Sequence, residues 1–245
     1  MTQPELARHF GVTPQTVRQW RKAHGLPSPR RPPVGTPGGG GHVKYHTDPD
    51  FFAKIDTPEK AYILGFIVAD GTVHKNGKVV DIAVKTSDEN ILRAIAKATG
   101  CNAPIGRKVS TGYGGVARES ARLHLSRRKL VSDLGLLGVH PNKTFTATYP
   151  VVDASLERHL VRGLWDGDGY VGKQQFSLIG TDAVVEGVME AAERHTGCRF
   201  TPRRDRKGFL YALGSARDRP IMRWMYSDAS ISLDRKAEAF RLYWS

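Results

Sequence analysis

The sequence has few cysteines, few acidic residues and no long apolar run. Cys101 and Cys198 are its only cysteines in 245 residues, and neither belongs to a CxxC pair, which excludes a disulfide-stabilised scaffold and a zinc ribbon. No window approaches the roughly 18 consecutive apolar residues of a membrane span, so we expect no membrane partner. Hydrophobic residues still make up 40% of the chain, which is enough for a globular core in one or two domains.

Acidic residues are outnumbered by basic ones. The chain has 37 Lys and Arg against 24 Asp and Glu, a formal net charge of +13. A surplus of this size favours a polyanionic partner, most often nucleic acid. The scarcity of cysteine fits a reducing compartment, and we expect a cytoplasmic protein encoded by a bacterium or a phage.

Residues 4–24 have the pattern of two short helices with a turn between them. Gly11 lies between the two stretches, and Thr13 followed by Pro14 is typical of a helix start. We predict a small all-α helix-turn-helix DNA-binding module over residues 1–26, with an ordinary helical hairpin as the alternative. Its second helix would present side chains suited to base edges and phosphates, namely Gln15, Thr16, Arg18, Gln19 and Arg21.

A linker is expected next. Residues 27–41 contain five prolines and five glycines and have no apolar periodicity. The sequence therefore predicts a flexible linker over residues 27–49.

From residue 50 the sequence reads as two copies of one unit, residues 50–150 and 151–245. Helix and strand patterns follow in a similar order in both halves. Three pairs of anchors recur at separations of 98, 97 and 93 residues: Asp70 with Asp168, Cys101 with Cys198, and Lys143 with Lys236. Such regular separations predict a duplicated αββαββα unit and an α+β fold.

One apolar helix in each half has a glycine in its middle and ends in Asp-Gly, over residues 63–71 and 161–169. A mid-helix glycine costs about 1 kcal/mol relative to alanine. This cost is explained if two helices approach closely at Gly65 and Gly163. We therefore expect these glycines at a helix–helix interface.

The two helices are expected to end in an unusual way. Gly71 and Gly169 suit a C-terminal cap with positive φ. Asp70 and Asp168 then face the negative ends of the helix dipoles, and packing of the helices would bring both carboxylates together. A divalent cation would stabilise such a pair, and carboxylate and carbonyl oxygens suit Mg²⁺.

These two segments resemble the signature helices of the LAGLIDADG homing endonucleases, and the resemblance covers about residues 50–245. It implies a duplicated αββαββα fold with pseudo-two-fold symmetry. The signature helices would form the interface, and each sheet would lie over the DNA major groove. It also implies a monomer that makes metal-dependent, site-specific double-strand breaks in DNA by phosphodiester hydrolysis, in the setting of intron homing.

The resemblance also implies roles for particular residues. Asp70 and Asp168 would bind the metal, Mg²⁺ or Mn²⁺, through their carboxylates, and Ala69 and Gly167 through their main-chain carbonyls. Lys143 and Lys236, which match basic residues of similar proteins, are assigned to water activation or to neutralisation of transition-state charge. With these lysines, both aspartates form the candidate catalytic set.

Three residues at two motif positions differ from the family pattern or between the two copies. Val68 replaces the first Asp of the motif in the first copy, at a position that is variable in role within the family. Asp166 keeps that Asp in the second copy, as a helper or a bystander. Arg162 takes a position that is usually small, where it either crowds the helix interface or points away from it.

The strands are expected to contact the DNA. Alternation over residues 117–126 puts polar side chains on one face and apolar ones on the other. The predicted DNA-binding residues on strands and loops are Arg107, Lys108, Arg118, Arg122, His124, Arg203, Arg204, Arg206 and Lys207.

Two other functions stay open. One is a catalytically inactive transcriptional regulator of the same fold, and the other is an RNA maturase. Both Asp-Gly ends and both lysines speak against the regulator. The predicted helix-turn-helix favours DNA over RNA.

Overall fold

The computed structural model describes residues 3–25, 44–111 and 117–245. These belong to two compact units, Met1–Lys44 and Tyr45–Ser245. Each unit is described by itself. No helix in the described residues is long and apolar enough to cross a membrane.

The first unit contains two helices, α1 (Gln3–His9) and α2 (Pro14–Ala23). Gly11 has a φ of +61° in the turn between them, and the Thr13 hydroxyl caps α2 by accepting a hydrogen bond from the Thr16 amide at 3.2 Å. Ala7 and Val17 are buried. Of the residues predicted to contact bases, Gln15, Arg18 and Gln19 are exposed, whereas Thr16 and Arg21 are half-buried.

The predicted linker lies largely outside the described residues, which resume at residue 44. Its last residues belong to the second unit. His46 Nδ1 lies 2.9 Å from the carbonyl oxygen of Gly100, and the Asp48 amide donates to that of Thr99 at 2.9 Å. The second unit therefore begins before residue 50.

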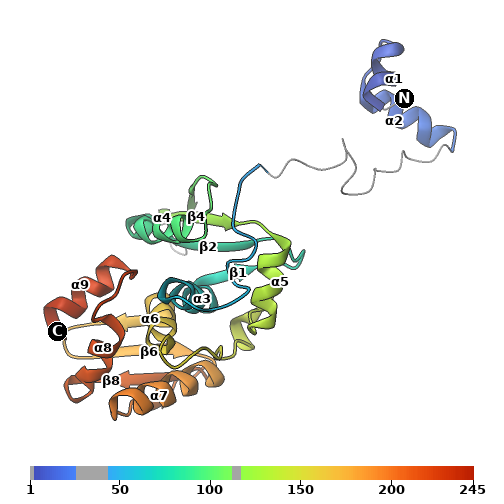
Figure 1. Ribbon diagram of the computed structural model, residues 1–245. Helices are drawn as coiled ribbons and strands as arrows, with labels where there is room; N and C mark the ends of the chain where they lie inside the picture. The colour runs from blue at the N-terminus through green and yellow to red at the C-terminus, as the bar shows by residue number, and fades with distance from the viewer. Residues whose placement is uncertain (1–2, 26–43, 112–116) are drawn as a thin grey trace. The chain divides into compact units, whose positions relative to one another are not determined.

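The second unit contains the same order of elements twice (Figure 1). The first copy consists of α3 (Pro58–Asp70), β1 (Gly71–Val73), β2 (Val80–Lys85), the 3₁₀ helix η1 (Thr86–Asp88), α4 (Glu89–Ala98), β3 (Gly106–Thr111), β4 (Ala117–Leu125), α5 (Arg128–Leu136) and the 3₁₀ helix η2 (Lys143–Phe145). The second copy consists of α6 (Glu157–Asp168), β5 (Gly169–Val171), β6 (Phe176–Gly180), α7 (Asp182–Thr196), β7 (Thr201–Arg204), β8 (Leu210–Gly214), the 3₁₀ helix η3 (Ala216–Asp218), α8 (Arg219–Tyr226) and α9 (Asp234–Tyr243).

Each copy forms a four-stranded antiparallel sheet, in the order β1-β2-β4-β3 or β5-β6-β8-β7. The predicted duplicated α+β fold is confirmed. The sequence patterns missed two elements. The short strand β1 directly follows α3, where a helix cap was expected, and α9 has no counterpart among the predicted elements.

The core lies where the motif helices meet the sheets. Figure 1 shows α3 and α6 between the two sheets, and every residue of α3 from Ala61 to Val68 is buried. In the first sheet Ala121, Leu123 and Leu125 of β4 are fully buried at alternate positions. We call the opposite side of each sheet, which carries the intervening residues, its open face.

Aromatic rings fill the core of the second copy. Trp165 of α6 stacks on Phe200 with 5.5 Å between ring centroids, and Phe176 meets Trp244 edge to face at 4.8 Å. The indole N–H of Trp244 donates to the carbonyl oxygen of Gly172 at 2.8 Å. The C-terminal end of α9 is thereby fixed to the sheet.

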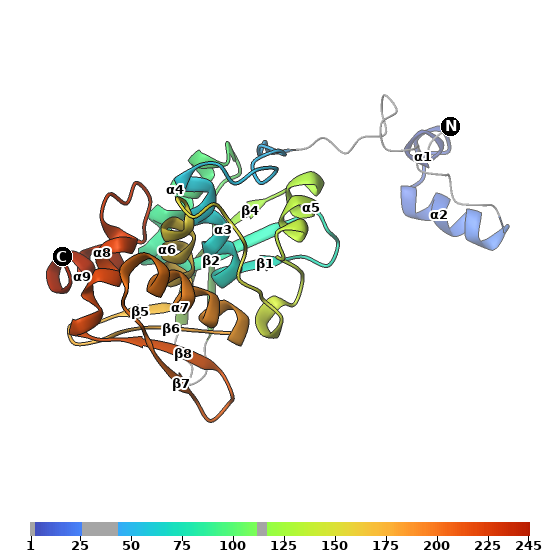
Figure 2. The same ribbon diagram turned by 60° about the horizontal axis from the view of Figure 1, so that its bottom comes forward.

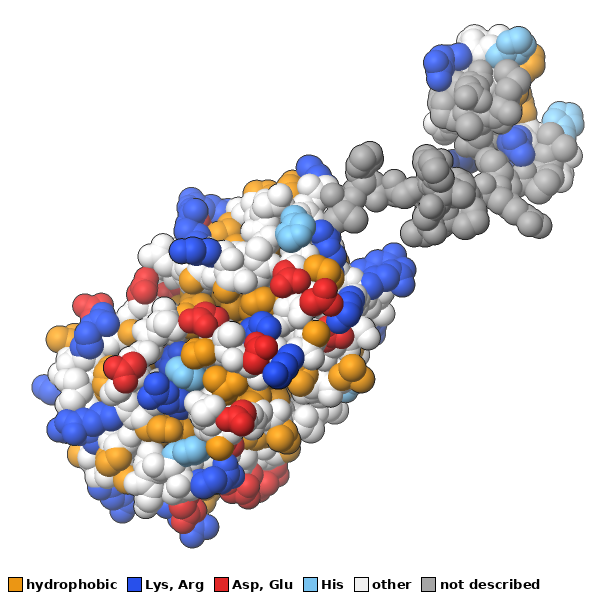
Figure 3. Space-filling view, viewed as in Figure 1, with side chains coloured by type: hydrophobic (Ala, Val, Ile, Leu, Met, Phe, Trp, Pro, Cys, Tyr) orange, Lys and Arg blue, Asp and Glu red, His pale blue; other side chains and the backbone are white. Residues whose placement is uncertain are grey.

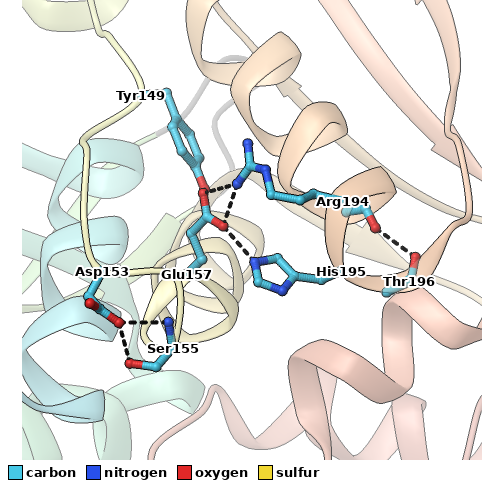
Figure 4. A network of polar contacts seen from close by, with 8 residues as sticks. Tyr149, Asp153, Ser155, Glu157, Arg194, His195 and Thr196 are labelled. Carbon is cyan, nitrogen blue, oxygen red and sulfur yellow. Dashed lines mark hydrogen bonds and ion pairs between the residues drawn. The ribbon is translucent and has the colours of Figure 1, made fainter.

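A buried carboxylate connects the start of α6 to the end of α7. Glu157 accepts hydrogen bonds from Arg194 at 2.7 and 2.8 Å, and its other contacts are His195 Nε2 at 2.7 Å and the Tyr149 hydroxyl at 3.5 Å (Figure 4). Burial and the charge of Glu157 raise the pKa of Tyr149 far above its ordinary value. This network holds the segment between the two copies in place.

Candidate metal centre and nucleic-acid interface

The motif helices α3 and α6 touch backbone to backbone at their central glycines. A Cβ atom on Gly65 would lie 2.2 Å from the carbonyl oxygen of Leu160, and one on Gly163 would lie 2.0 Å from that of Tyr62. Non-bonded heavy atoms rest about 3.5 Å apart, so no larger side chain fits at either position. The two glycines therefore allow the helices to approach as closely as two backbones can.

The close approach continues to the C-terminal ends of both helices. A Cβ atom on Gly167 would lie 2.3 Å from the Cβ of Ala69 and 3.4 Å from the amide nitrogen of Asp70. Asp70 and Asp168 are the last residues of α3 and α6, and both are exposed. The two aspartates therefore lie at the same end of the helix pair.

Electrostatic coupling links the two carboxyl groups. The pKa of Asp168 is raised to about 6, first by desolvation and then by the charge of Asp70. Desolvation also raises the pKa of Asp70, against the opposing positive charges of Lys236 and Lys143. Since both groups also face the negative ends of helix dipoles, a divalent cation would be stabilised between them.

The raised pKa of Asp168 predicts a dependence of stability on pH. The folded chain holds this proton more tightly than the unfolded chain, so stability falls as pH rises from the ordinary value of 3.8 to about 6, and the penalty persists above that. Asp168→Asn mimics the protonated form. We expect it to raise the melting temperature by about 2 °C at pH 7.5 without metal, and hardly at all at pH 4. Calorimetry at both pH values checks this, and a lower melting temperature of the variant at pH 7.5 would contradict it.

The expected positive φ at Gly71 and Gly169 is wrong. Their φ angles are −74° and −89°, because each helix runs directly into a strand. Glycine is needed there for space. A Cβ on Gly71 would lie 2.6 Å from the carbonyl oxygen of Ile67, and one on Gly169 would lie 2.4 Å from that of Trp165.

Lys143 and Lys236 each bind the C-terminal end of the motif helix in their own half. Lys143 Nζ, in η2, donates to two carbonyl oxygens of α3, and one of these is Ala69 at 2.8 Å. Lys236 Nζ, in the first turn of α9, donates to two carbonyl oxygens of α6, and one of these is Asp166 at 2.8 Å. Lys143 therefore occupies a carbonyl that the resemblance assigns to the metal, whereas Lys236 leaves that of Gly167 to other partners.

The two lysines differ in burial. Lys236 is 2% exposed, and desolvation lowers its pKa to about 8, with Asp166 opposing the shift. Lys143 is only half-buried, and desolvation lowers its pKa against the charges of Asp168 and Asp70. Both ammonium groups bring positive charge to the carboxylate pair.

Asp166 turns away from the helix tips and into the protein. Its carboxylate is fully buried and accepts hydrogen bonds from the Tyr226 hydroxyl at 2.6 Å, the Leu233 amide at 2.7 Å and the Tyr62 hydroxyl at 2.8 Å. These donors come from α8, from the residue before α9 and from α3. Of the two roles left open for Asp166, the geometry favours that of a bystander to catalysis that joins α6 to both copies.

Arg162 is also fully buried, and its guanidinium contacts both α3 and the segment around the end of α8. It donates to the carbonyl oxygens of Ile231 at 2.9 Å and Met225 at 2.8 Å, and its guanidinium lies 5.3 Å from the ring centre of Tyr62. The charge of Asp166 opposes the desolvation that lowers the pKa of Arg162. The two residues thus form a buried, opposite-charged network around α6.

Replacing Asp166 tests this structural role. Asp166→Asn removes the negative charge and sets an amide donor among three donors. We expect it to lower the free energy of unfolding by about 3 kcal/mol, as measured by urea denaturation. Asp56→Asn, at an exposed ion pair with Lys60, should leave stability nearly unchanged. Equal stability of the Asp166 variant and the wild type would refute the role.

A hollow opens beside each motif aspartate. A cavity of about 230 Å³ is lined by Asp168, Lys143 and Ala69, and another of about 390 Å³ by Asp70 with Asp88 and Arg235 among others. No three His, Cys, Asp or Glu side chains gather into a complete metal cage within the described ranges. Carboxylates and carbonyls at an open hollow fit Mg²⁺, which keeps waters and substrate phosphate oxygens among its ligands.

The predicted DNA-binding residues divide between the two sides of the sheets. Arg107 and Arg204 lie on the helix side, where Arg107 pairs with Glu89 of α4 and Arg204 with Asp182 of α7, each at 2.9 Å. The register explains this, because Arg107 lies opposite the buried Ala121 and Arg204 lies opposite the buried Leu210. These two arginines are committed to holding α4 and α7.

The remaining basic residues lie elsewhere on the sheets. Lys108, Arg122, His124 and Arg203 occupy open-face register positions. Arg206 and Lys207 are exposed in the turn of the β7–β8 hairpin, which extends from the body in Figure 2. The side chain of Arg118 lies outside the described part of the structure. In Figure 3, acidic and basic side chains alternate over the visible face, without a field of one sign.

Sequence reasoning missed Asp81 and His74 on the open face of the first sheet. Asp81 is 6% exposed, with His74 Nε2 at 2.8 Å, His124 Nδ1 in close contact, and Arg122 at 3.7 Å. The signal was present, because the alternation of Val80, Ile82 and Val84 already puts Asp81 on the opposite side of β2.

A comparison with known proteins finds one matching domain family. Residues 57–133 match the model of the LAGLIDADG-like domain. These residues form a LAGLIDADG-like domain. The domain spans the first copy from the start of α3 into α5, and includes Asp70. No curated protein sequence matches the chain.

Solved structures show the LAGLIDADG homing endonuclease fold over both copies. The homing endonuclease I-WcaI bound to its DNA recognition sequence is similar with a TM-score of 0.56 and 11% identity, over 83% of this chain and 95% of that one. Mesophilic variants of the homing endonuclease I-DmoI are similar with a TM-score of 0.52 and 15% identity, over 76% of this chain and 98% of that one. I-DmoI in complex with DNA and Ca is similar with a TM-score of 0.51 and 16% identity, again over 76% of this chain and 98% of that one. At these identities the likeness concerns the fold.

Proposed function

We propose that this protein is a site-specific DNA endonuclease that hydrolyses one phosphodiester bond in each strand with divalent cations at the tips of α3 and α6. The observation that carries this is the backbone contact of the two helices, which sets Asp70 and Asp168 beside each other. The pKa of Asp168 is raised to about 6, first by desolvation and then by the negative charge of Asp70. Carboxylates crowded at the negative ends of two helices are unfavourable unless a cation joins them.

The residues present suit a Mg²⁺-type centre. Asp70 and Asp168 would hold the cations through carboxylate oxygens, with the main-chain carbonyl of Gly167 nearby, whereas that of Ala69 already accepts a hydrogen bond from Lys143. When bound, the cation supplies Lewis-acid stabilisation of charge on the phosphate. Lys143 already donates to the Ala69 carbonyl, so its ammonium group lies where it can oppose the charge of a phosphate in the hollow.

The rest of the chain would bind the duplex. The open faces of the two sheets carry Lys108, Arg122 and Arg203, and the first unit carries Arg18 on an exposed helix position. We propose that both units bind DNA, and that a single chain suffices because it holds both motif helices. Tethering two binding modules raises the effective concentration of the second on the site.

Binding should depend steeply on salt. Each phosphate contact by Lys or Arg releases counterions, so a site with 6–10 such contacts loses about 10³–10⁵ in affinity between 50 and 200 mM salt. Fluorescence anisotropy without divalent metal measures the slope of the logarithm of affinity against the logarithm of salt concentration. Arg18→Gln should reduce the slope by about one, and Arg204→Gln, whose arginine pairs with Asp182, should reduce it less. A slope near zero would contradict DNA binding by phosphate contacts.

Selection of cleaved sites tests the proposal directly. A plasmid library with a randomised insert is incubated with the full chain and Mg²⁺, and linearised molecules are sequenced. We expect enrichment of one asymmetric site, and no linear product with EDTA. Absence of cleavage with both Mg²⁺ and Mn²⁺ would overturn the proposal.

A regulator of the same fold is the second candidate. The observation that favours it is the engagement of both lysines with helix carbonyls, which accounts for the presence of a lysine in each half without any catalytic chemistry. In the same experiment, tight binding to a selected duplex with no cleavage would favour this candidate.

A further inference from the structure

Strand register makes the two sheets comparable residue by residue. The glycine after each motif aspartate, Gly71 or Gly169, pairs with Ile82 of β2 or with Leu178 of β6. Counting outward from these pairs, open-face positions of the first sheet correspond one to one with those of the second. The chemistry at equivalent positions can then be compared directly.

The first pair of facing open-face residues differs in charge between the two sheets. In the first sheet Asp81 of β2 lies opposite His124 of β4. In the second sheet the equivalent pair is Ser177 of β6 opposite Leu213 of β8. An acid and a histidine in one half are therefore replaced by a hydroxyl and an aliphatic side chain in the other.

The next pair of facing open-face residues is also charged in the first sheet and uncharged in the second. In the first sheet Ala83 lies opposite Arg122, and in the second sheet Ile179 lies opposite Tyr211. On the edge strand, Tyr170 is 55% exposed at the position equivalent to Thr72. On the two central strands, the open face of the first sheet is thus charged and that of the second is apolar and aromatic, and the one basic residue on the described strands of the second open face, Arg203, lies on the edge strand β7 opposite Tyr211.

The charged face is organised around one carboxylate. The Asp81 side chain is 8% exposed, whereas those of His124 and Arg122 are 50% and 39% exposed. His124 Nδ1 contacts Asp81 closely, and Arg122 lies 3.7 Å from it. The buried Asp81 carboxylate therefore fixes the His124 and Arg122 side chains beside it, while both side chains stay accessible to a ligand.

We propose that the two halves read DNA by different chemistry: Arg122, held by Asp81, recognises guanine, and the apolar face around Leu213 recognises thymine methyl groups. This rests on the proposed function, which lays both open faces against the major groove. An arginine there bonds the O6 and N7 acceptors of guanine, and apolar side chains contact the C5 methyl of thymine. Asp81 is the positioning residue, and Leu213 and Tyr211 set the specificity of the second half.

Base analogues that remove one group each provide the test. The full chain is first used to enrich duplexes from a randomised library without divalent metal. In an enriched duplex each thymine is then replaced in turn by deoxyuridine, which lacks the methyl group, and each guanine by 7-deazaguanine, which lacks N7. Anisotropy should show about fourfold weaker binding for deoxyuridine in one half-site. It should show roughly tenfold weaker binding for 7-deazaguanine in the other.

Two matched variants assign each effect to its half. Leu213→Ala should abolish the deoxyuridine effect and keep the 7-deazaguanine effect, and Arg122→Ala should do the reverse. Asp81→Asn should weaken discrimination at the guanine while leaving the deoxyuridine effect intact. Circular dichroism verifies that each variant is folded.

Several results would overturn the inference. These are no effect of deoxyuridine in any position, equal effects in both half-sites, or a deoxyuridine effect that persists in Leu213→Ala. A change of mass in solution for Leu213→Ala with unaltered affinity would mean that the apolar face packs on a second copy. A library without any enriched duplex would contradict the proposed function itself, a result distinct from uniform reading of both halves.

Discussion

Asp70→Asn and Asp168→Asn are each expected to turn double-strand cleavage into nicking of one strand, and the double variant to be inactive. Each aspartate ends a different motif helix and borders a different hollow. Mutating a residue that only supports a metal ligand typically lowers metal affinity or activity by about 10–100-fold. Loss of a ligand itself should therefore slow cleavage of the corresponding DNA strand by at least about 100-fold. A supercoiled plasmid carrying the selected site distinguishes open-circular from linear product.

Folding and binding must be separated from catalysis in that experiment. Asp168→Asn removes one of two repelling charges, so its melting temperature should not fall, and DNA binding without metal should persist. Asp56→Asn, near the opposite end of α3, serves as the matched control with unchanged cleavage. Unimpaired double-strand cleavage by either motif variant would refute the assignment of that residue.

Gly163→Ala is expected to lower the free energy of unfolding by about 3 kcal/mol, although alanine favours a helix by about 1 kcal/mol. The added Cβ would lie 2.0 Å from the carbonyl oxygen of Tyr62 and 2.8 Å from the amide nitrogen of Phe66. Both are backbone atoms in the buried part of α3 and cannot rotate aside. The steric term therefore outweighs helix propensity, and α3 and α6 must separate.

A second helical glycine provides the control. Gly135 lies in α5, and a Cβ there would meet nothing nearer than the His140 ring at 3.9 Å. Gly135→Ala should therefore stabilise the chain slightly or leave it unchanged. Urea denaturation followed by tryptophan fluorescence measures both variants. Equal stabilities of Gly163→Ala and Gly135→Ala would show that the helix contact is not as close as described.

Much of the fold and of the candidate centre could be predicted because the information is local. A glycine in mid-helix, an Asp-Gly end and the recurrence of both after 98 residues are visible in contiguous sequence. Alternation over β4 likewise gave its two faces, with Ala121, Leu123 and Leu125 fully buried. These features follow from helix and strand periods alone.

Other features needed contacts between distant segments. All six residues of β3 are exposed, so burial does not distinguish the two faces of this strand. Only its register with β4 assigns Arg107 to the helix side and Lys108 to the open face. Asp166 reads as a second acid of the motif, yet hydroxyl groups from α3 and α8 turn it inward.

The sequence by itself determined the duplicated α+β unit, the paired aspartates and the need for glycine where the helices meet, because each is set by local period and spacing. The tertiary structure decided which charges remain available to a ligand. A side chain 18 or 60 residues away can satisfy a charged group, as Glu89 does for Arg107 and Tyr226 for Asp166, and such pairing follows from folding rather than from spacing.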